Sequence, residues 1–208
     1  MILNNINSSL GRIRVRIAKR EDAERIKTLI NSAFRLAESF FVDEDRLDGK
    51  GVLKFLDTGK FLLAESEDLL LGCVYVEAHR LSAAAGGTLD RAFAGRGDED
   101  QRLAIETDDA ALGISDPKFS RAYLGLLAVD PAHQKFGLAT LLMDAAEDHC
   151  RGLGAGFMDI KVVNLRKELF GYYRRRGYVE VGTSPFPAEV VSKLPCHFVE
   201  MSKPLHRH

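Results

Sequence analysis

The segment 123–142 constrains the fold more than any other part of this chain. It reads YLGLLAVDPAHQKFGLATLL: an apolar run ends at Asp130-Pro131, a short polar loop containing Gly137 follows, and an amphipathic pattern begins. This order predicts a buried strand, a tight loop and the start of a helix. The first amides of a helix lack intrahelical acceptors and lie at the positive end of its dipole. The segment therefore predicts a binding site for a phosphate or a diphosphate.

The composition indicates one ordinary globular domain. The 208 residues can bury a sizeable core, and 46% of them are apolar and 28% charged. The net charge of −1 gives no basic excess for nucleic acid or a membrane surface. No apolar run approaches the ~18 residues of a membrane span, and no secretory signal is evident. The three cysteines lack C-x-x-C spacing, so we expect reduced thiols, no metal site and a cytoplasmic location.

The hydrophobic periodicity predicts strands and helices on both sides of this segment. Strands alternate apolar and polar residues, whereas helices carry an apolar stripe at helical spacing. The predicted strands cover residues 13–17, 60–65, 70–77, 123–129, 157–163, 178–181 and 197–201. The predicted helices cover residues 21–38, 52–56, 138–150 and 166–176. We expect from this alternation a mixed α/β sheet with helices on both faces.

We expect a single domain over residues 1–208, with three parts outside its regular core. Residues 1–11 are predicted to be a loose leader, and residues 203–208 a frayed tail. The segment 81–119 mixes small and charged residues that cannot bury much surface, so it is predicted to be a mobile insertion. It either covers a substrate cleft or is a solvated excursion.

The loop and the motifs after it resemble a known family. A Q-x-x-G-x-A pattern at 134–139 follows an apolar strand, and D-I-K at 159–161, Asn164 and Y-x-x-x-G-Y at 173–178 come later. Their order and approximate spacing resemble the GNAT N-acetyltransferase superfamily over residues 123–186. The resemblance implies a mixed, mostly antiparallel central sheet flanked by helices on both faces. It also implies acetyl-CoA as the acyl donor.

The resemblance further implies that the main chain holds acetyl-CoA. Strand residues before the loop would bind the pantetheine arm, and loop amides would wrap the diphosphate, which Gly137 would let approach closely. The implied cofactor-binding residues are Leu127, Ala128, Val129, Gln134, Lys135, Phe136, Gly137, Leu138, Ala139, Thr140 and Asn164. Asn164 departs from the family pattern, because it lies nine residues before Tyr173 where seven is usual.

Tyr173 is the candidate catalytic acid. In the resembled family a tyrosine at this spacing lies near the thioester sulfur, and a phenol with a pKa near ~10 can protonate the departing thiolate. The alternative is an aromatic residue on the buried side of a helix. Glu77 is preferred to Glu65 as the candidate base, although water could accept the proton and Glu77 could be an ordinary strand residue. Cys196 and His197 cannot form a catalytic pair, because neighbours on a strand point to opposite faces.

We therefore expect an acetyl-CoA-dependent N-acetyltransferase that acetylates a primary amine of a small molecule by direct transfer in a ternary complex. One alternative is a non-catalytic acyl-CoA-binding or sensing module. Another is an enzyme that acetylates protein N-termini or lysines. We expect no metal, nucleic-acid or membrane partner. The sequence does not decide between a monomer and a homodimer.

Overall fold

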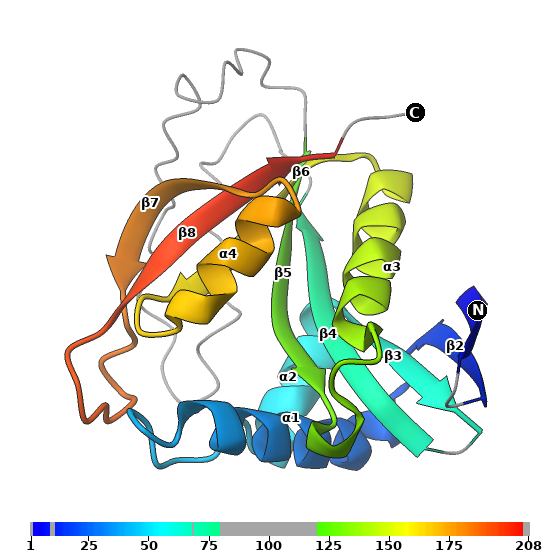
Figure 1. Cartoon of the computed structure of the whole chain (residues 1–208), viewed down its shortest axis with the longest axis horizontal. Helices are drawn as coiled ribbons and strands as arrows, with labels where there is room; N and C mark the ends of the chain where they lie inside the picture. The colour runs from blue at the N-terminus through cyan, green and yellow to red at the C-terminus, as the bar shows by residue number, and fades with distance from the viewer. Residues whose placement is uncertain (1, 9–10, 68, 80–119, 206–208) are drawn as a thin grey trace.

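The computed structural model describes residues 2–8, 11–67, 69–79 and 120–205. Within these residues eight strands form one sheet in the order β1-β2-β3-β4-β5-β6-β8-β7 (Figure 1). All neighbouring strands are antiparallel except β5 and β6, which are parallel. The expected mixed, mostly antiparallel sheet is thus confirmed. The predicted insertion 81–119 lies outside the described residues.

The elements follow the predicted order closely. The strands are β1 (Ile2–Ser8), β2 (Gly11–Ile17), β3 (Lys60–Ser66), β4 (Leu69–His79), β5 (Ser120–Val129), β6 (Ala155–Val163), β7 (Val179–Pro185) and β8 (His197–Pro204). The α-helices are α1 (Ala23–Glu38), α2 (Gly49–Thr58), α3 (Leu138–Gly152) and α4 (Lys167–Arg175), with short 3-10 turns at Arg20–Asp22 and Pro131–His133. Among the helices that the structure describes, none has the length and apolar character needed to cross a bilayer.

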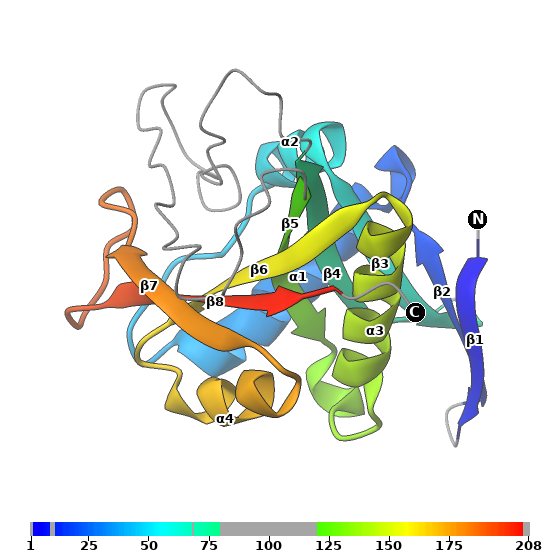
Figure 2. The ribbon, with the colours of Figure 1, turned by 90° about the horizontal axis from the view of Figure 1, so that it is seen from above.

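Helices cover both faces of the sheet, as expected. Figure 2 shows α3 and α4 on one face and α1 and α2 on the other. The apolar stripe of α3, with Leu142 and Met143 fully buried, packs into the core on its face. The stripe of α1, with Ile26 and Ile30 fully buried, packs into the core on the opposite face. Each amphipathic helix therefore buries its stripe against the sheet, and the sheet separates the two cores.

The sheet opens between its two parallel strands. β5 pairs with β6 only up to Tyr123, opposite Asp159, and beyond this point the strands separate (Figure 1). The pairing of β5 with β4 also shifts register here, and Leu126 has a φ of +50°. Gly125 is required at this bend, because a Cβ there would lie 2.7 Å from the Tyr123 ring. The main chain of β5 past Tyr123 thus leaves the β6 ladder.

Both ends of the chain differ from the prediction. Instead of a loose leader, residues 2–8 form β1, which pairs with β2. An edge strand can be held by main-chain hydrogen bonds alone, so the asparagine-rich sequence of residues 2–8 shows no strand pattern of apolar and β-branched side chains. At the other end, Lys203 belongs to β8, and Leu205 is buried and donates its N–H to the Gly156 carbonyl at 2.7 Å. The tail is therefore part of the fold through residue 205, and residues 206–208 lie outside the described part.

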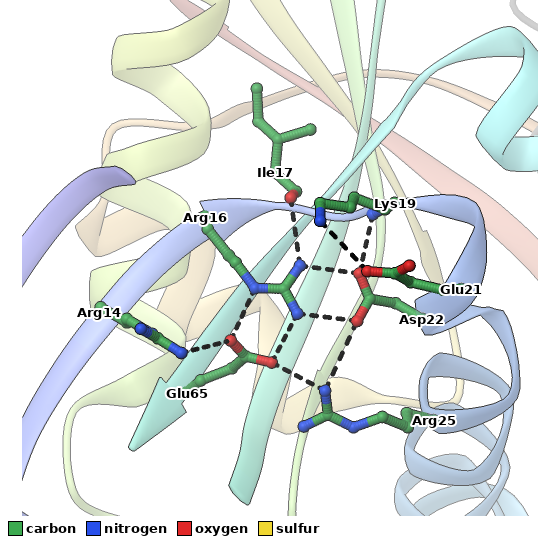
Figure 3. Close-up of polar contacts among 8 residues, drawn as sticks. All are labelled: Arg14, Arg16, Ile17, Lys19, Glu21, Asp22, Arg25 and Glu65. Atoms are coloured by element: carbon green, nitrogen blue, oxygen red, sulfur yellow. Dashed lines mark hydrogen bonds and ion pairs between the residues drawn. The ribbon is translucent and has the colours of Figure 1, made fainter. Parts of the chain in front are cut away.

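A network of charged side chains around the buried carboxylates Asp22 and Glu65 joins β2, β3 and the start of α1 (Figure 3). Arg16 donates from Nη1 to Asp22 Oδ2 and from Nε to Glu65 Oε2, both at 2.7 Å. Arg25 and Arg14 also approach Glu65, at 3.1 and 3.9 Å. Three guanidinium groups thus compensate the Glu65 carboxylate, which indicates a structural role for the residue that was the weaker base candidate.

Candidate active site

A cleft of about 600 Å³ lies where β5 and β6 separate. Its walls come from α1 on one face of the sheet and from α3 and α4 on the other, with β5 and β6 between them. The cleft therefore passes through the opening in the sheet. A molecule bound along β5 would be accessible to a second molecule from the α1 face.

The loop after β5 is shaped by local hydrogen bonds and two left-handed residues. Asp130 Oδ1 accepts the Ala132 N–H at 2.8 Å and so starts the 3-10 turn. Lys135 and Gly137 then have φ values of +71° and +77°. This conformation is costly for most L-residues but not for glycine. The two turns direct the chain into α3 beside the cleft.

The first turn of α3 presents uncapped amides to the cleft. No side chain caps this helix, and its first i→i−4 bond runs from Leu141 N–H to the Gly137 carbonyl at 3.0 Å. The amides of Leu138, Ala139 and Thr140 precede that bond and have no acceptor within the helix. A Cβ at Gly137 would meet no atom within 4 Å, so the space before the helix is open. This arrangement suits an anionic diphosphate at the positive end of the helix dipole.

Most of the predicted cofactor residues line this cleft. All of them do so except Phe136 and Asn164. Phe136 is exposed. Asn164 instead holds β6 to the start of β8: its Oδ1 accepts the His197 N–H at 3.0 Å, and its own N–H donates to the His197 carbonyl at 3.0 Å. A role of Asn164 in binding pantetheine stays a prediction.

Tyr173 lines the cleft from α4 and is almost fully buried. Its ring packs edge-on against Tyr172 and Tyr178, with centroids 5.3 and 5.8 Å away. Burial raises the pKa of Tyr173 to about 12. The phenol therefore keeps its proton at neutral pH and can act as a hydrogen-bond donor, but not as a base.

Tyr172 also lines the cleft, which the sequence argument did not anticipate. Its Oη is buried and has no hydrogen-bond partner within the described residues. An unpartnered buried hydroxyl is uncommon in a native fold and suggests a ligand or water as its partner. Helical geometry separates Tyr172 and Tyr173 by about 100°, yet the cleft is wide enough to include both side chains.

Glu77 lies beside the cleft but does not line it. It is paired across the ladder with Tyr123, whose side chain does line the cleft. Glu77 Oε2 accepts the Tyr75 hydroxyl at 2.7 Å, and that hydroxyl is 2.9 Å from Thr58 Oγ1. The assignment of Glu77 as the base stays a prediction.

The sequence argument missed a charged group on the α1 side of the cleft. Its members are Glu38 at the end of α1, Arg46, Lys161 on β6 and Arg166 before α4. Arg46 Nη1 is 3.3 Å from Glu38 Oε2, and Arg166 Nη1 is 3.5 Å from Glu38 Oε1. Their sequence separation is large and irregular, so no spacing pattern could have grouped them. Only the tertiary fold brings them together.

Solved structures of several proteins described as acetyltransferases share this fold. The yncA protein of Salmonella typhimurium, solved with its cofactor acetyl-CoA, superposes with a TM-score of 0.59 at 15% identity, covering 94% of this chain and 95% of that one. The ribosomal-protein-alanine N-acetyltransferase of Brucella melitensis superposes with a TM-score of 0.60 at 14% identity, covering 91% of this chain and 98% of that one. The GNAT domain of PAT from S. lividans superposes with a TM-score of 0.60 at 16% identity, covering 97% of this chain and 96% of that one. At these identities the likeness concerns the fold.

The sequence comparison gives the family directly. No curated protein sequence matched the chain. The profile of the acetyltransferase (GNAT) family, however, matches residues 23–178, from the first residue of α1 to the tyrosine that closes the Y-x-x-x-G-Y motif. This match covers three quarters of the chain and includes the loop before α3 and the three tyrosines that line the cleft. The chain therefore belongs to the acetyltransferase (GNAT) family.

Proposed function

We propose that this protein transfers the acetyl group of acetyl-CoA to the primary amine of a small molecule, directly within a ternary complex. The observation that carries the proposal is the first turn of α3. Its uncapped amides face the same cleft that contains Tyr173. The unpartnered Oη of Tyr172 is a second sign that the cleft accommodates a polar ligand.

The residues present fit acetyl-CoA, which would supply an activated acyl thioester. The amides between Gln134 and Thr140 would hold its diphosphate, and the main chain of Leu127, Ala128 and Val129 would hold its pantetheine arm. Both groups line the cleft continuously with Tyr173, apart from the exposed Phe136.

Direct transfer is favoured because the described lining contains no cysteine, histidine or serine to carry the acyl group. Cys73 and Cys150 lie in the cores, where burial raises the pKa of both thiols and keeps them protonated. An acceptor amine approaching from the α1 face would therefore attack the thioester itself.

The transfer requires two proton movements. The amine nitrogen gains the acetyl carbon as the carbon–sulfur bond breaks, so the amine loses a proton and the sulfur requires one. Tyr173 Oη is the donor that we assign to the sulfur, because Tyr173 lines the cleft and its phenol is protonated at neutral pH. Glu77, acting directly or through water, is the acceptor that we assign to the amine proton.

A thiol-release assay tests this function. Purified protein is mixed with acetyl-CoA and a broad panel of primary amines, and both free thiol and acetylated product are measured. Release that depends on the amine supports the proposal, whereas failure to bind acetyl-CoA overturns it. The Tyr75–Glu77 hydrogen bond favours a second candidate, a non-catalytic acyl-CoA-binding module. Binding without acceptor-dependent release would identify that module.

A further inference from the structure

The α1 side of the cleft is rich in charged side chains, namely Glu38, Arg46, Lys161 and Arg166. Lys161 pairs at 3.3 Å with the buried Glu200, which does not line the cleft, so the two arginines and Glu38 determine the charge of this side. The opposite end, formed by the loop and α3, has Lys135 as its one charged residue within the described lining. An acceptor that enters from the α1 face therefore meets this charged group.

The two arginines are arranged around Glu38 rather than locked onto it. Their Nη1 atoms lie 3.3 and 3.5 Å from its two carboxylate oxygens. By contrast, Arg16 binds Asp22 and Arg121 binds Asp159 through two nitrogens each, at 2.5 to 2.8 Å. Strong pairs of this kind close to about 2.7–2.9 Å. The contacts of Arg46 and Arg166 with Glu38 are thus longer than those in these two bidentate pairs.

These arginines are also largely withdrawn from solvent. The side chains of Arg46 and Arg166 are 11% and 16% exposed, and that of Glu38 is 8% exposed. Burying a guanidinium group is costly unless anionic oxygens compensate it. Burial lowers the pKa of Arg46, and the neighbouring Arg166 acts in the same direction. Glu38 is the one carboxylate among the described lining residues, and Glu168, the second partner of Arg166, is 64% exposed, so a further anion beside the two guanidinium groups would be stabilised in this low-dielectric site.

The orientation of Arg166 suits a planar anion. Its Nε donates to the exposed Glu168 at 2.6 Å, while Nη1 faces Glu38. The bond from Nε to Glu168 thus fixes the Arg166 guanidinium group at the protein surface, and its two Nη nitrogens extend away from Glu168. With Nε bonded to Glu168, the Nη1–Nη2 end is the part of the guanidinium that could match a carboxylate in two hydrogen bonds, and Nη1 would then exchange its long contact with Glu38 for a ligand oxygen.

We infer that the acceptor carries a carboxylate as well as its primary amine, and that Arg166, together with Arg46, binds this carboxylate. The inference rests on the acetyl transfer proposed above and names its substrate class as small amino acids and similar amino carboxylates. A polyamine would instead add positive charge beside the two arginines. A protein N-terminus lacks the free α-carboxylate of its first residue.

Matched acceptors test the inference in the wild-type protein. The common L-amino acids are each compared with the corresponding carboxamide, which retains the α-amine and loses the negative charge. We expect kcat/KM for the best amino acid to exceed that for its amide by about 10- to 100-fold, the worth of one or two charge-assisted hydrogen bonds. Equal or better acetylation of amides, polyamines or peptide N-termini would overturn the inference and leave the transfer itself standing.

The substitution Arg166→Gln tests whether Arg166 is responsible for the preference for amino acids. It should remove most of the preference for the acid over the amide by lowering kcat/KM for the acid. Arg174→Gln is the matched control, because Arg174 lies on α4, is 61% exposed, pairs with Glu180 and does not line the cleft. The control should keep the wild-type preference. A preference that survives both Arg166→Gln and Arg46→Gln would contradict the assignment.

A binding measurement separates this inference from the proposed function. Calorimetric titration of the same amino acids and amides onto the protein with CoA present needs no turnover. Preferential binding of the acids without acetylation would refute the transfer and retain the carboxylate site. If no amino acid either binds or reacts better than its amide, the carboxylate site is refuted.

Discussion

Replacing each of three clustered tyrosines by phenylalanine separates chemistry from packing. Tyr172, Tyr173 and Tyr178 form one aromatic row, with adjacent ring centroids 5.3 and 5.8 Å apart. Phenylalanine keeps the ring and its edge-on contacts and removes only the hydroxyl group. The three substitutions therefore differ in what each hydroxyl does, and not in the volume that each side chain fills.

Tyr173→Phe should reduce turnover and little else. We expect kcat to fall about 10- to 1000-fold, or about 1.4–4 kcal/mol, because the donor to the leaving sulfur is lost. The affinity for acetyl-CoA should hardly change, since main-chain groups make the proposed contacts. The free energy of unfolding should change by less than about 1 kcal/mol, because the substitution leaves no described partner unsatisfied.

The neighbouring substitutions should give the opposite pattern or none. Tyr178 donates to the buried Glu147 at 3.3 Å and lies outside the cleft lining. Tyr178→Phe should therefore cost about 1 kcal/mol, which lowers Tm by about 2–4 °C in a chain of this size, and should keep kcat. Tyr172→Phe should change kcat by less than about threefold, because the Oη of Tyr172 is not the assigned proton donor.

Steady-state thiol release gives kcat and KM for each variant, calorimetry gives the affinity for acetyl-CoA, and thermal denaturation gives Tm. Wild-type turnover in Tyr173→Phe would return Tyr173 to a packing role. A loss of turnover in Tyr172→Phe instead would show that the donor has been assigned one residue too far along the chain.

Three further predictions concern the loop, the buried charges and the buried phenols. Gly137→Ala places an L-residue at a φ of +77°. It should lower the free energy of unfolding by about 1–2 kcal/mol and Tm by about 2–8 °C. An unchanged Tm would contradict the left-handed conformation of residue 137. Arg16→Met leaves Asp22 and Glu65 without their main partner, so urea denaturation should show a loss of about 3 kcal/mol or more, and a loss below about 1 kcal/mol would refute a structural role for the network. Burial raises the pKa of Tyr173 from its ordinary value of 10.0 to about 12, so its contribution to stability is complete below about pH 10 and lost as pH rises towards 12. Denaturation between pH 9 and 12, followed with tyrosinate absorbance, should show this decline of stability. A stability that stays constant over this range would contradict the burial of the Tyr173 phenol.

The cofactor side of the site was predictable because its signals are local. A strand, a turn and an uncapped helix start follow one another within residues 123–142, and main-chain groups do the expected binding. Hydrophobic periodicity located α1 and the β3–β4 hairpin for the same reason. The start of α2 was placed three residues late, because Gly49 and Gly51 obscured the capping hydrogen bond that Asp48 Oδ1 accepts from Gly51 at 2.6 Å.

The acceptor side could not be predicted, because it depends on long-range contacts. Glu38 and Arg166 are far apart in sequence and meet only when α1 and α4 cover opposite faces of the separated strands. The burial of Glu65 beneath Arg16 likewise depends on the register of β2 with β3. Tyr172 lines the cleft because the opening in the sheet is wide. The spacing of residues along a helix carries no information about that width.

Amide chemical shifts of the loop and the first turn of α3 provide the most direct test of how this protein holds its acyl donor. In a ¹⁵N-labelled sample, CoA should shift the amide resonances of Gly137, Leu138, Ala139 and Thr140, because these N–H groups would donate to the diphosphate. Pantetheine, which lacks the diphosphate, should leave them in place while shifting residues of β5. If CoA leaves the four resonances unchanged, or if pantetheine shifts them equally, the diphosphate is not bound at the start of α3.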